Sequence, residues 1–358
     1  MPLKRTQTPS WLKRLIRVTW KFVLVLVVIG SVWLLFTKLR AGVASDPATK
    51  ALLDNGGIWN DIKVIVAVIV ANVLDIPGKS LIYATLSALA AYVALAWYDR
   101  IALLHLDRLK GISWPYVAVC SFVTYAFAHN LGASVLSGGL VRLRAYYAKG
   151  LSAAEVAALV AMCSFTFLFG TLLLLGVVLV FEPEIVPSLS DIIPRMLLPV
   201  WFVQTTGVFL LLLCALYVLG SWRTFKPFQV GTLDIVYPRL GIVGRQLLAA
   251  PLEIMSAAGI IYFVLPKAGN PGYFVVLGAF ILSFSAALVS QAPGGLGVME
   301  AVFLAIIDTD AVPPTSVFAA LLVWRLLYLM LPLALSIPVI LVFEGSRAVK
   351  YDMPRKDE

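Results

Sequence analysis

Long apolar runs alternate with short polar segments along almost the whole chain. A helix needs about 20 apolar residues to cross a bilayer, and eight runs approach or exceed that length. The runs are Val18–Phe36, Leu81–Tyr98, Ser113–Gly132, Ser152–Phe181, Met196–Leu219, Leu240–Leu265, Tyr273–Gln291 and Thr315–Phe343. The pattern therefore predicts an all-α polytopic membrane protein with about eight transmembrane helices, in which residues 1–358 form a single membrane domain. The apolar stretch within residues 60–74 is shorter, and the pattern allows either a helix on the outer face or a short span.

Composition and charge support the same class. Of the 358 residues, 61% are hydrophobic and 13% are charged, whereas soluble domains carry about 25% charged residues. The net charge of +9 comes largely from Lys and Arg beside the apolar runs, including the basic tails 1–17 and 345–358. Basic flanks mark the cytoplasmic side, so both termini are predicted to lie in the cytoplasm. This distribution favours anionic lipid as a partner over nucleic acid and allows a homo-oligomer.

Two segments place glycine pairs beside apolar sequence. These are "SVLSGGLVRLRAYY" with Gly138 and Gly139, and "SQAPGGLGVMEAVF" with Pro293, Gly294, Gly295 and Gly297. Broken backbone at membrane depth survives only inside protein or beside water, so the sequence predicts two re-entrant or broken helical hairpins. A tight turn at the membrane surface is the alternative.

The hairpins belong to two units, 114–181 and 273–343, that resemble each other. The loop charges predict that the first unit starts inside and the second starts outside. Opposite starts are typical of an inverted repeat. The helix that restarts near Gly297 would direct its N–H groups at the tip of the second hairpin, where anions are attracted.

Ionisable residues inside the apolar runs are candidates for a substrate path, because charges in a membrane tend to pair or to serve transport. Glu253, Glu300 and Arg325 lie in or beside predicted helices, and a structural ion pair of Arg325 with either glutamate is the alternative. Arg142 and Arg144 follow the first glycine pair, and a turn would let both face one phosphate. The positive-inside bias is the alternative for this pair.

Catalysis and metal binding have little support in the sequence. No Ser/His/Asp set, nucleotide-binding loop or metal-ligand spacing is present, and the three cysteines stand apart. His129 ends the predicted helix before the first break, and a hydrogen-bonded structural role is favoured for it. The chain is therefore predicted to be no enzyme and to use no cofactor or metal.

Three segments together resemble a known family. "GASVLSGGLVRLRAYYAKGLSAAEVA", "QAPGGLGVMEAVF" and "WRLLYLMLPLAL" are similar to the transmembrane region of lysylphosphatidylglycerol synthases and of related stand-alone bacterial inner-membrane proteins. The resemblance covers about residues 80 to 343 and lacks the soluble aminoacyl-transferase domain. Met299 stands where many relatives carry an aromatic residue. The resemblance implies an inner-membrane location and a lipid flippase. In the bifunctional relatives the cargo is aminoacylated phosphatidylglycerol, whereas stand-alone relatives need not carry it, so the resemblance leaves the lipid open.

The positions that match the family pattern are Gly138, Gly139, Arg142, Arg144, Pro293, Gly294, Gly295, Gly297, Glu300, Arg325 and Tyr328. Together with Glu253, these residues form the predicted substrate site and hairpin positions. The chain is predicted to move the headgroup of an anionic or aminoacylated phospholipid between leaflets. A non-transporting scaffold that binds anionic lipid and a membrane-embedded lipid-modifying enzyme are the alternatives.

Overall fold

The computed structural model describes residues 28–45, 47–53, 57–130, 134–185, 199–223, 228–230, 233–235, 238–307 and 311–352. Helical residues 28–44 come first. The helices that follow are α2 (Pro47–Leu53), α3 (Gly57–Leu74), α4 (Gly78–His105), α5 (Trp114–Asn130), α6 (Ser134–Tyr147), α7 (Ala153–Phe181), α8 (Val200–Trp222), α9 (Leu240–Val264), α10 (Tyr273–Ser290), α11 (Val298–Ile306), α12 (Pro314–Arg325) and α13 (Leu331–Asp352). The 3₁₀ turns η1 (Pro183–Ile185) and η4 (Pro293–Gly295) and the π-helical turn η5 (Leu326–Met330) join some of them.

The all-α polytopic membrane fold is confirmed. Within the described residues, seven helical stretches are long and apolar enough to cross a bilayer. They are α3, α4, α7, α8, α9, α10 and the continuous stretch Pro314–Val342. α5, with 17 residues, stands at the lower limit for a span. α3 is 18 residues long, so the short apolar stretch at 60–74 is part of a helix of spanning length.

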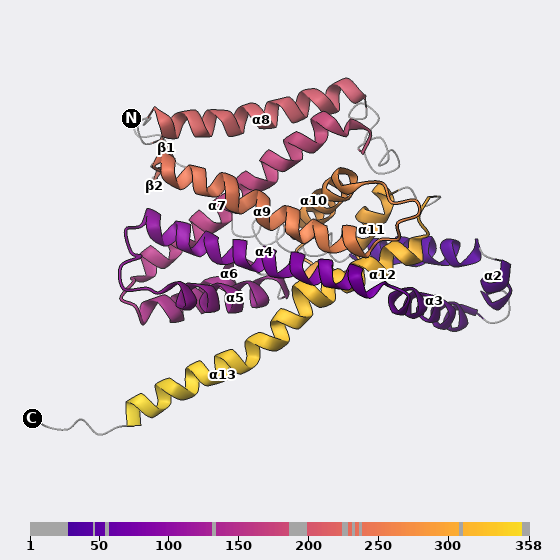
Figure 1. Ribbon diagram of the computed structural model, residues 1–358, viewed down its shortest axis with the longest axis horizontal. Helices are drawn as coiled ribbons and strands as arrows, with labels where there is room; N and C mark the ends of the chain where they lie inside the picture. The colour runs from indigo at the N-terminus through magenta and orange to yellow at the C-terminus, as the bar shows by residue number, and fades with distance from the viewer. Residues whose placement is uncertain are drawn as a thin grey trace, which may run out of the picture.

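The core forms where small residues let helices approach closely. α4 and α9 pack along their lengths, and Ala84, Ala88 and Ala91 of α4 are buried. A Cβ on Gly259 of α9 would lie 3.1 Å from Ser87 Oγ. Small side chains at an interface bring two backbones close enough for extensive van der Waals contact in a membrane. α7 packs against both α8 and α9, and together these long helices form the body seen in Figure 1.

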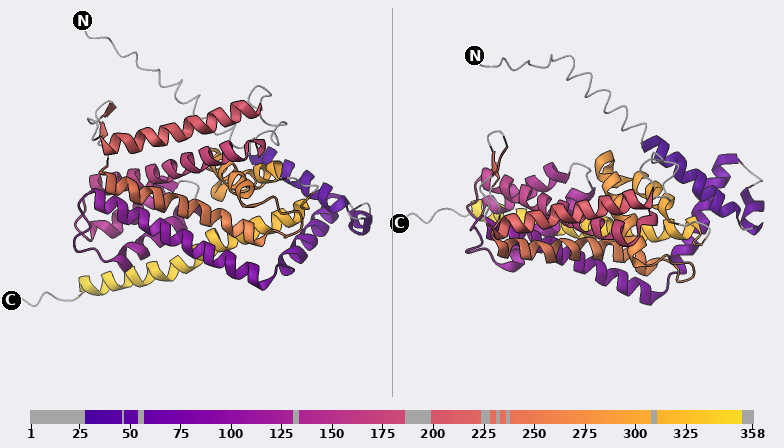
Figure 2. Two further views of the ribbon diagram at one scale, coloured as in Figure 1. Left: turned by 45° about the horizontal axis from the view of Figure 1, so that its top comes forward. Right: turned by 90° about the horizontal axis from the view of Figure 1, so that it is seen from above.

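The two predicted hairpins occupy different halves of this body. α5 packs against α6, and α10 packs against α11. Figures 1 and 2 show α5 and α6 toward one end of the long helices and α10 and α11 toward the other. Each pair is followed by a long helical segment. The inverted repeat and the membrane depth of these hairpins stay predictions.

Some predicted boundaries need correction. Gly138 and Gly139 lie inside α6, so the glycine pair is no break in the helix. A Cβ on Gly138 would lie 3.1 Å from Thr124 Cγ2 of α5, which gives this glycine a packing role. The helix expected to end at Tyr98 continues to His105, which places Asp99 inside α4.

The second predicted break is confirmed as a break. Gln291, Gly294, Gly295 and Gly297 all have positive φ, from 53° to 80°, a conformation that favours glycine. The chain therefore leaves α10, makes the 3₁₀ turn η4 and restarts as α11.

The connection after α8 and the two ends of the chain complete the description. A short antiparallel hairpin, β1 (Phe228–Val230) with β2 (Leu233–Ile235), lies between α8 and α9. The predicted first helix falls partly outside the described residues, as do residues 1–17. Residues 353–358 of the predicted C-terminal tail are also outside the described residues.

Candidate functional site

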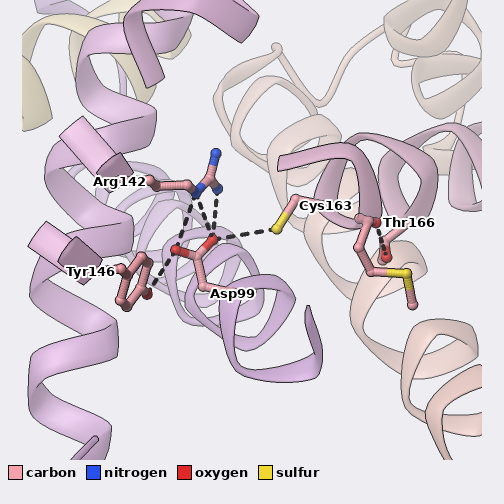
Figure 3. A network of polar contacts seen from close by, with 6 residues as sticks. Asp99, Arg142, Tyr146, Cys163 and Thr166 are labelled. Carbon is pink, nitrogen blue, oxygen red and sulfur yellow. Dashed lines mark hydrogen bonds and ion pairs between the residues drawn. The ribbon is translucent and has the colours of Figure 1, made fainter. Parts of the chain in front are cut away.

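A buried ion pair joins α4 to α6. Arg142 donates from Nη2 to Asp99 Oδ1 at 2.6 Å and from Nε to both carboxylate oxygens at 3.2 Å. The Asp99 side chain is fully buried, and Arg142 is 4% exposed. Figure 3 shows the carboxylate of Asp99 between Arg142 and Cys163. The guanidinium that the sequence offered to a phosphate already has a carboxylate partner.

The surroundings of this pair complete its hydrogen bonding. Tyr146 donates its hydroxyl to Asp99 Oδ2 at 3.1 Å, and Cys163 Sγ lies 3.5 Å from Oδ1 (Figure 3). The Arg142 guanidinium lies over the ring of Tyr125, 4.9 Å from its centroid. A buried pair needs such partners, because desolvation otherwise exceeds the Coulomb attraction. The cluster therefore ties α4, α5, α6 and α7 together.

Arg144 lies on another face of α6. Two residues correspond to about 200° of rotation around a helix, and the helix is unbroken between Arg142 and Arg144. Arg144 is exposed and lines an apolar groove of about 560 Å³ between α5, α6 and α13. Tyr116, Val123 and Ile340 also line this groove. The structure thus does not bring the two arginines together in one phosphate clamp.

A second buried ion pair lies at the helix break after α10. Arg325, at the end of α12, donates from Nε to Glu300 Oε1 at 2.5 Å and from Nη1 to Gly294 O at 2.7 Å. Glu300 Oε2 accepts from Gly297 N at 2.8 Å. Glu300 therefore caps the N-terminus of α11 with its own carboxylate. This is the structural pair that the sequence left as an alternative, and it fixes the shape of the turn.

This second pair is surrounded by incompletely satisfied groups. In the part of the chain that the structure describes, Arg325 Nη2, Trp324 Nε1 and His129 Nδ1 are buried and have no hydrogen-bond partner. The lining of a cavity of about 60 Å³ includes His129, Trp324 and Gly294, and the carbonyl of Gly294 accepts from Arg325 Nη1. Buried polar atoms are paired in more than 90% of cases, so this concentration of unpaired nitrogens is unusual.

Glu253 has hydroxyl partners where the other buried carboxylates have arginines. Tyr328 in the π-helical turn donates to Oε1 at 2.5 Å, and Tyr98 donates to Oε2 at 3.4 Å. Within the described residues no Lys or Arg forms a salt bridge with Glu253. The structure thus brings Glu253 and Tyr328 together, two of the predicted site residues, and separates Glu253 from Arg325.

The end of α5 connects the first hairpin to this region. The ring of His129 stacks on Tyr328 at 5.2 Å between centroids, and Tyr328 stacks on Trp324 at 5.3 Å. Asn130 donates from Nδ2 to Leu329 O at 3.0 Å and to Ala126 O at 2.7 Å. Single π-helical turns occur frequently at functional sites. His129, Trp324 and Tyr328 therefore form the aromatic side of the second ion pair.

Sequence reasoning missed two participants. Asp99 was taken for a helix end, although an acidic residue within an apolar run is itself a sign of a buried partner. Trp324 precedes Arg325 in a quoted segment but was given no role of its own. No group of three or more potential metal-ligating side chains occurs among the described residues.

The fold and the buried polar clusters define a multi-pass α-helical membrane protein. A protein from Synechocystis described only as uncharacterized is 29% identical over 245 residues, which are 68% of this chain and 72% of that protein. The inner membrane protein YbhN of Escherichia coli is 29% identical over 263 residues, 72% of this chain and 77% of YbhN. No family model matches the chain.

A third similarity is local. A phosphatidylglycerol lysyltransferase of Staphylococcus haemolyticus is 33% identical over 106 residues, which are 29% of this chain but only 12% of that enzyme. The resemblance predicted from the three sequence segments is thereby confirmed. With its apolar helices and its similarity to YbhN, the chain is a multi-pass protein of the bacterial inner membrane.

Proposed function

We propose that this protein is a lipid flippase-like transporter that moves the phosphate-bearing headgroup of a phospholipid between the two leaflets. The observation that carries the proposal is the polar region at the junction of α5, α11, α12 and η5. It combines a buried ion pair, a cavity and unpaired nitrogens in a fold made of apolar helices. Polar groups inside a membrane are costly and mark substrate paths.

The apolar groove supports a path for the acyl chains. It has a volume of about 560 Å³, within the 300–1,000 Å³ of typical ligand sites. Along α5, Val123 lines the groove and Ala128 lines the small cavity. At 1.5 Å per residue, these positions are about 7.5 Å apart along the helix axis. The two positions face about 140° apart around α5, so the headgroup of a lipid in the groove would pass around this helix to reach the polar region.

The helix break supplies a means of alternate opening. Gln291 and three glycines hold the chain between α10 and α11 in positive-φ conformations, and such segments absorb backbone changes in moving domains. In the proposed cycle, the two hairpins open the polar region to one leaflet and then to the other, as in transporters built from inverted repeats. The lipid is moved without a chemical change, so the chain acts as a transporter and no enzyme.

The relatives guide the choice of cargo. One similar segment belongs to a protein named phosphatidylglycerol lysyltransferase, so phosphatidylglycerol and its aminoacylated form are the first cargoes to test. In the proposal the Glu300–Arg325 pair shapes the polar region, and Glu253 with Tyr328 forms its second polar wall.

The test is headgroup translocation in proteoliposomes that contain fluorescent phosphatidylglycerol, with external dithionite as the quencher. Wild type should expose inner-leaflet lipid faster than protein-free vesicles. Arg325→Lys keeps the charge but loses the planar fork, and it should slow translocation about tenfold, the effect of about 1.4 kcal/mol. Arg245→Lys is the matched control, because Arg245 is exposed and, within the described residues, donates to Gly241 O of its own helix.

The outcomes separate the candidate functions. Equal rates with wild type and with empty vesicles would reject transport and favour the scaffold. A labelled lipid of changed mass, recovered by mass spectrometry, would favour the lipid-modifying enzyme.

A further inference from the structure

Within the described residues, three buried nitrogen atoms around the break after α10 have no hydrogen-bond partner. Trp324 is 1% exposed and Arg325 is 7% exposed, and Trp324 Nε1 and Arg325 Nη2 have no partner among the described residues. Both groups can only donate, whereas His129 Nδ1 donates or accepts according to its tautomer. A buried donor without an acceptor costs free energy. The site is therefore suited to a group that brings acceptor oxygens.

A space of suitable size is lined by His129 and Trp324, and Arg325 contacts its lining through Gly294. The cavity of about 60 Å³ is lined by His129 and Trp324, and by Gly294, whose carbonyl accepts from Arg325 Nη1. One water needs about 10–15 Å³ by the same kind of measure. The cavity thus has room for a small polyatomic group such as a phosphate, whose oxygens are strong acceptors.

We propose that this cavity binds the phosphate oxyanion of the transported phospholipid, through Trp324 Nε1, Arg325 Nη2 and His129 Nδ1. This inference rests on the proposed function and locates the phosphate within it. Glu300 accepts from Nε of Arg325 and Gly294 O accepts from Nη1, so the guanidinium keeps Nη2 for the phosphate. Guanidinium N–H groups match phosphate oxygens well.

The charge balance explains why such a site would release its ligand. Glu300 already compensates the charge of Arg325 at 2.5 Å, so the site has little net positive charge to hold an anion. Hydrogen bonds then carry most of the recognition, and the phosphate competes with Glu300 for the guanidinium. A transporter needs this intermediate strength, because it must bind its cargo and also let it go.

The other two arginines fit a phosphate less well. Arg142 has its Nε and Nη2 on Asp99, so phosphate would have to displace a buried carboxylate. Arg144 lines the apolar groove instead of this cavity, and it already interacts with another group of the protein. The proposed phosphate site therefore lies at the end of α12, and not at the pair of arginines on α6 that the sequence predicted.

The experiment measures binding to the full chain in detergent by native mass spectrometry. The probes are dihexanoyl phosphatidylglycerol, dihexanoylglycerol without a phosphate, and inorganic phosphate. Trp324→Phe keeps an aromatic ring and removes the N–H, and it should weaken phosphatidylglycerol binding about tenfold, the effect of one hydrogen bond to a charged group. Trp222→Phe is the matched control, because Trp222 is 63% exposed at the end of α8.

A second variant guards against a folding defect in the first. Leu288 lines the cavity and is 42% exposed, so Leu288→Trp should narrow the cavity without removing a donor. It should weaken phosphatidylglycerol binding and leave dihexanoylglycerol binding unchanged. Thermal unfolding without ligand should match wild type for this variant.

Each outcome has a defined meaning. Weaker binding in both variants supports the phosphate site. If inorganic phosphate alone binds and both variants weaken it, the oxyanion site stands and its source is free phosphate rather than a lipid headgroup. Unchanged phosphatidylglycerol binding in both variants overturns the proposal and leaves a hydrated cavity. Binding that persists in a protein without translocation would reject the proposed function and keep the site.

Discussion

The two buried Arg–carboxylate pairs have similar chemistry and different surroundings. Arg142 and Asp99 lie between regular helices, and a tyrosine and a cysteine complete the contacts of the carboxylate. Arg325 and Glu300 lie at an interrupted helix, beside a cavity and unpaired nitrogens. A satisfied buried network stabilises one structure, whereas a partly satisfied one is a candidate for ligand binding. The difference supports a structural role for the first pair and, within the proposed function, a role in cargo recognition for the second.

Removing one charge from the first pair should have the largest effect on stability. Asp99→Asn leaves Arg142 buried without a counter-charge, and breaking a buried pair in this way costs about 3–5 kcal/mol. The thermal unfolding temperature in detergent should fall sharply, or folded protein should be lost. The double variant Asp99→Leu/Arg142→Met should regain most of the stability, because apolar replacement of a whole buried pair is often neutral. A double variant as unstable as the single one would contradict the assigned structural role.

The tyrosine beside Glu253 should have the next largest effect. Tyr328→Phe removes the hydroxyl that donates to Glu253 Oε1 and leaves a buried acceptor underpaired, at a cost of about 1–3 kcal/mol. Chemical denaturation in detergent measures this change. Tyr83→Phe is the control, because Tyr83 is 53% exposed and surface substitutions stay within about 0.5 kcal/mol. An equal loss of stability in both variants would show that the hydroxyl contact with Glu253 stabilises the protein no more than an exposed tyrosine hydroxyl does.

A pair of glycine substitutions should have opposite effects, and Gly139→Ala should have the smallest effect of all. In Gly295→Ala the new Cβ would lie 2.5 Å from Ala287 Cβ on a backbone with φ of 65°. A left-handed conformation costs a non-glycine residue about 1–2 kcal/mol. Gly139 lies within α6 with nothing within 4 Å of a new Cβ, so Gly139→Ala should stabilise by about 0.5–1 kcal/mol. Destabilisation by Gly139→Ala would place a required distortion in α6, contrary to the structure.

The fold class could be predicted from the sequence because each apolar run is about as long as a helix that crosses the bilayer. The break at Pro293–Gly297 was equally readable, since a proline and three glycines in a few residues oppose a continuous helix. Gly138 and Gly139 also suggested a helix break, but both glycines lie inside a continuous helix. Small residues also serve close helix contact. In the unbroken α6, Gly138 packs near Thr124, whereas nothing lies within 4 Å of a Cβ added at Gly139.

The site was harder to predict because partners lie far apart in the chain. Arg142 and Asp99 are 43 residues apart, and Tyr328 and Glu253 are 75 apart. Sequence reveals that each charge needs a partner, but the packing of α4 against α9 and of α5 against α6 decides which partner is near. Trp324 had no sequence signal of its own, because an indole gains a role here only through an N–H group without an acceptor.

The most direct test compares the two regions in one transport assay. Proteoliposomes with fluorescent phosphatidylglycerol would contain wild type, the double variant Asp99→Leu/Arg142→Met, or the double variant Trp324→Phe/Arg325→Lys. Matched thermal unfolding would show that each protein is folded. The account predicts translocation close to wild type for the first double variant and a loss of at least about tenfold for the second, since two donors to a charged group are removed or altered. Transport lost with the α4–α6 pair and retained without Trp324 and Arg325 would contradict the assignment.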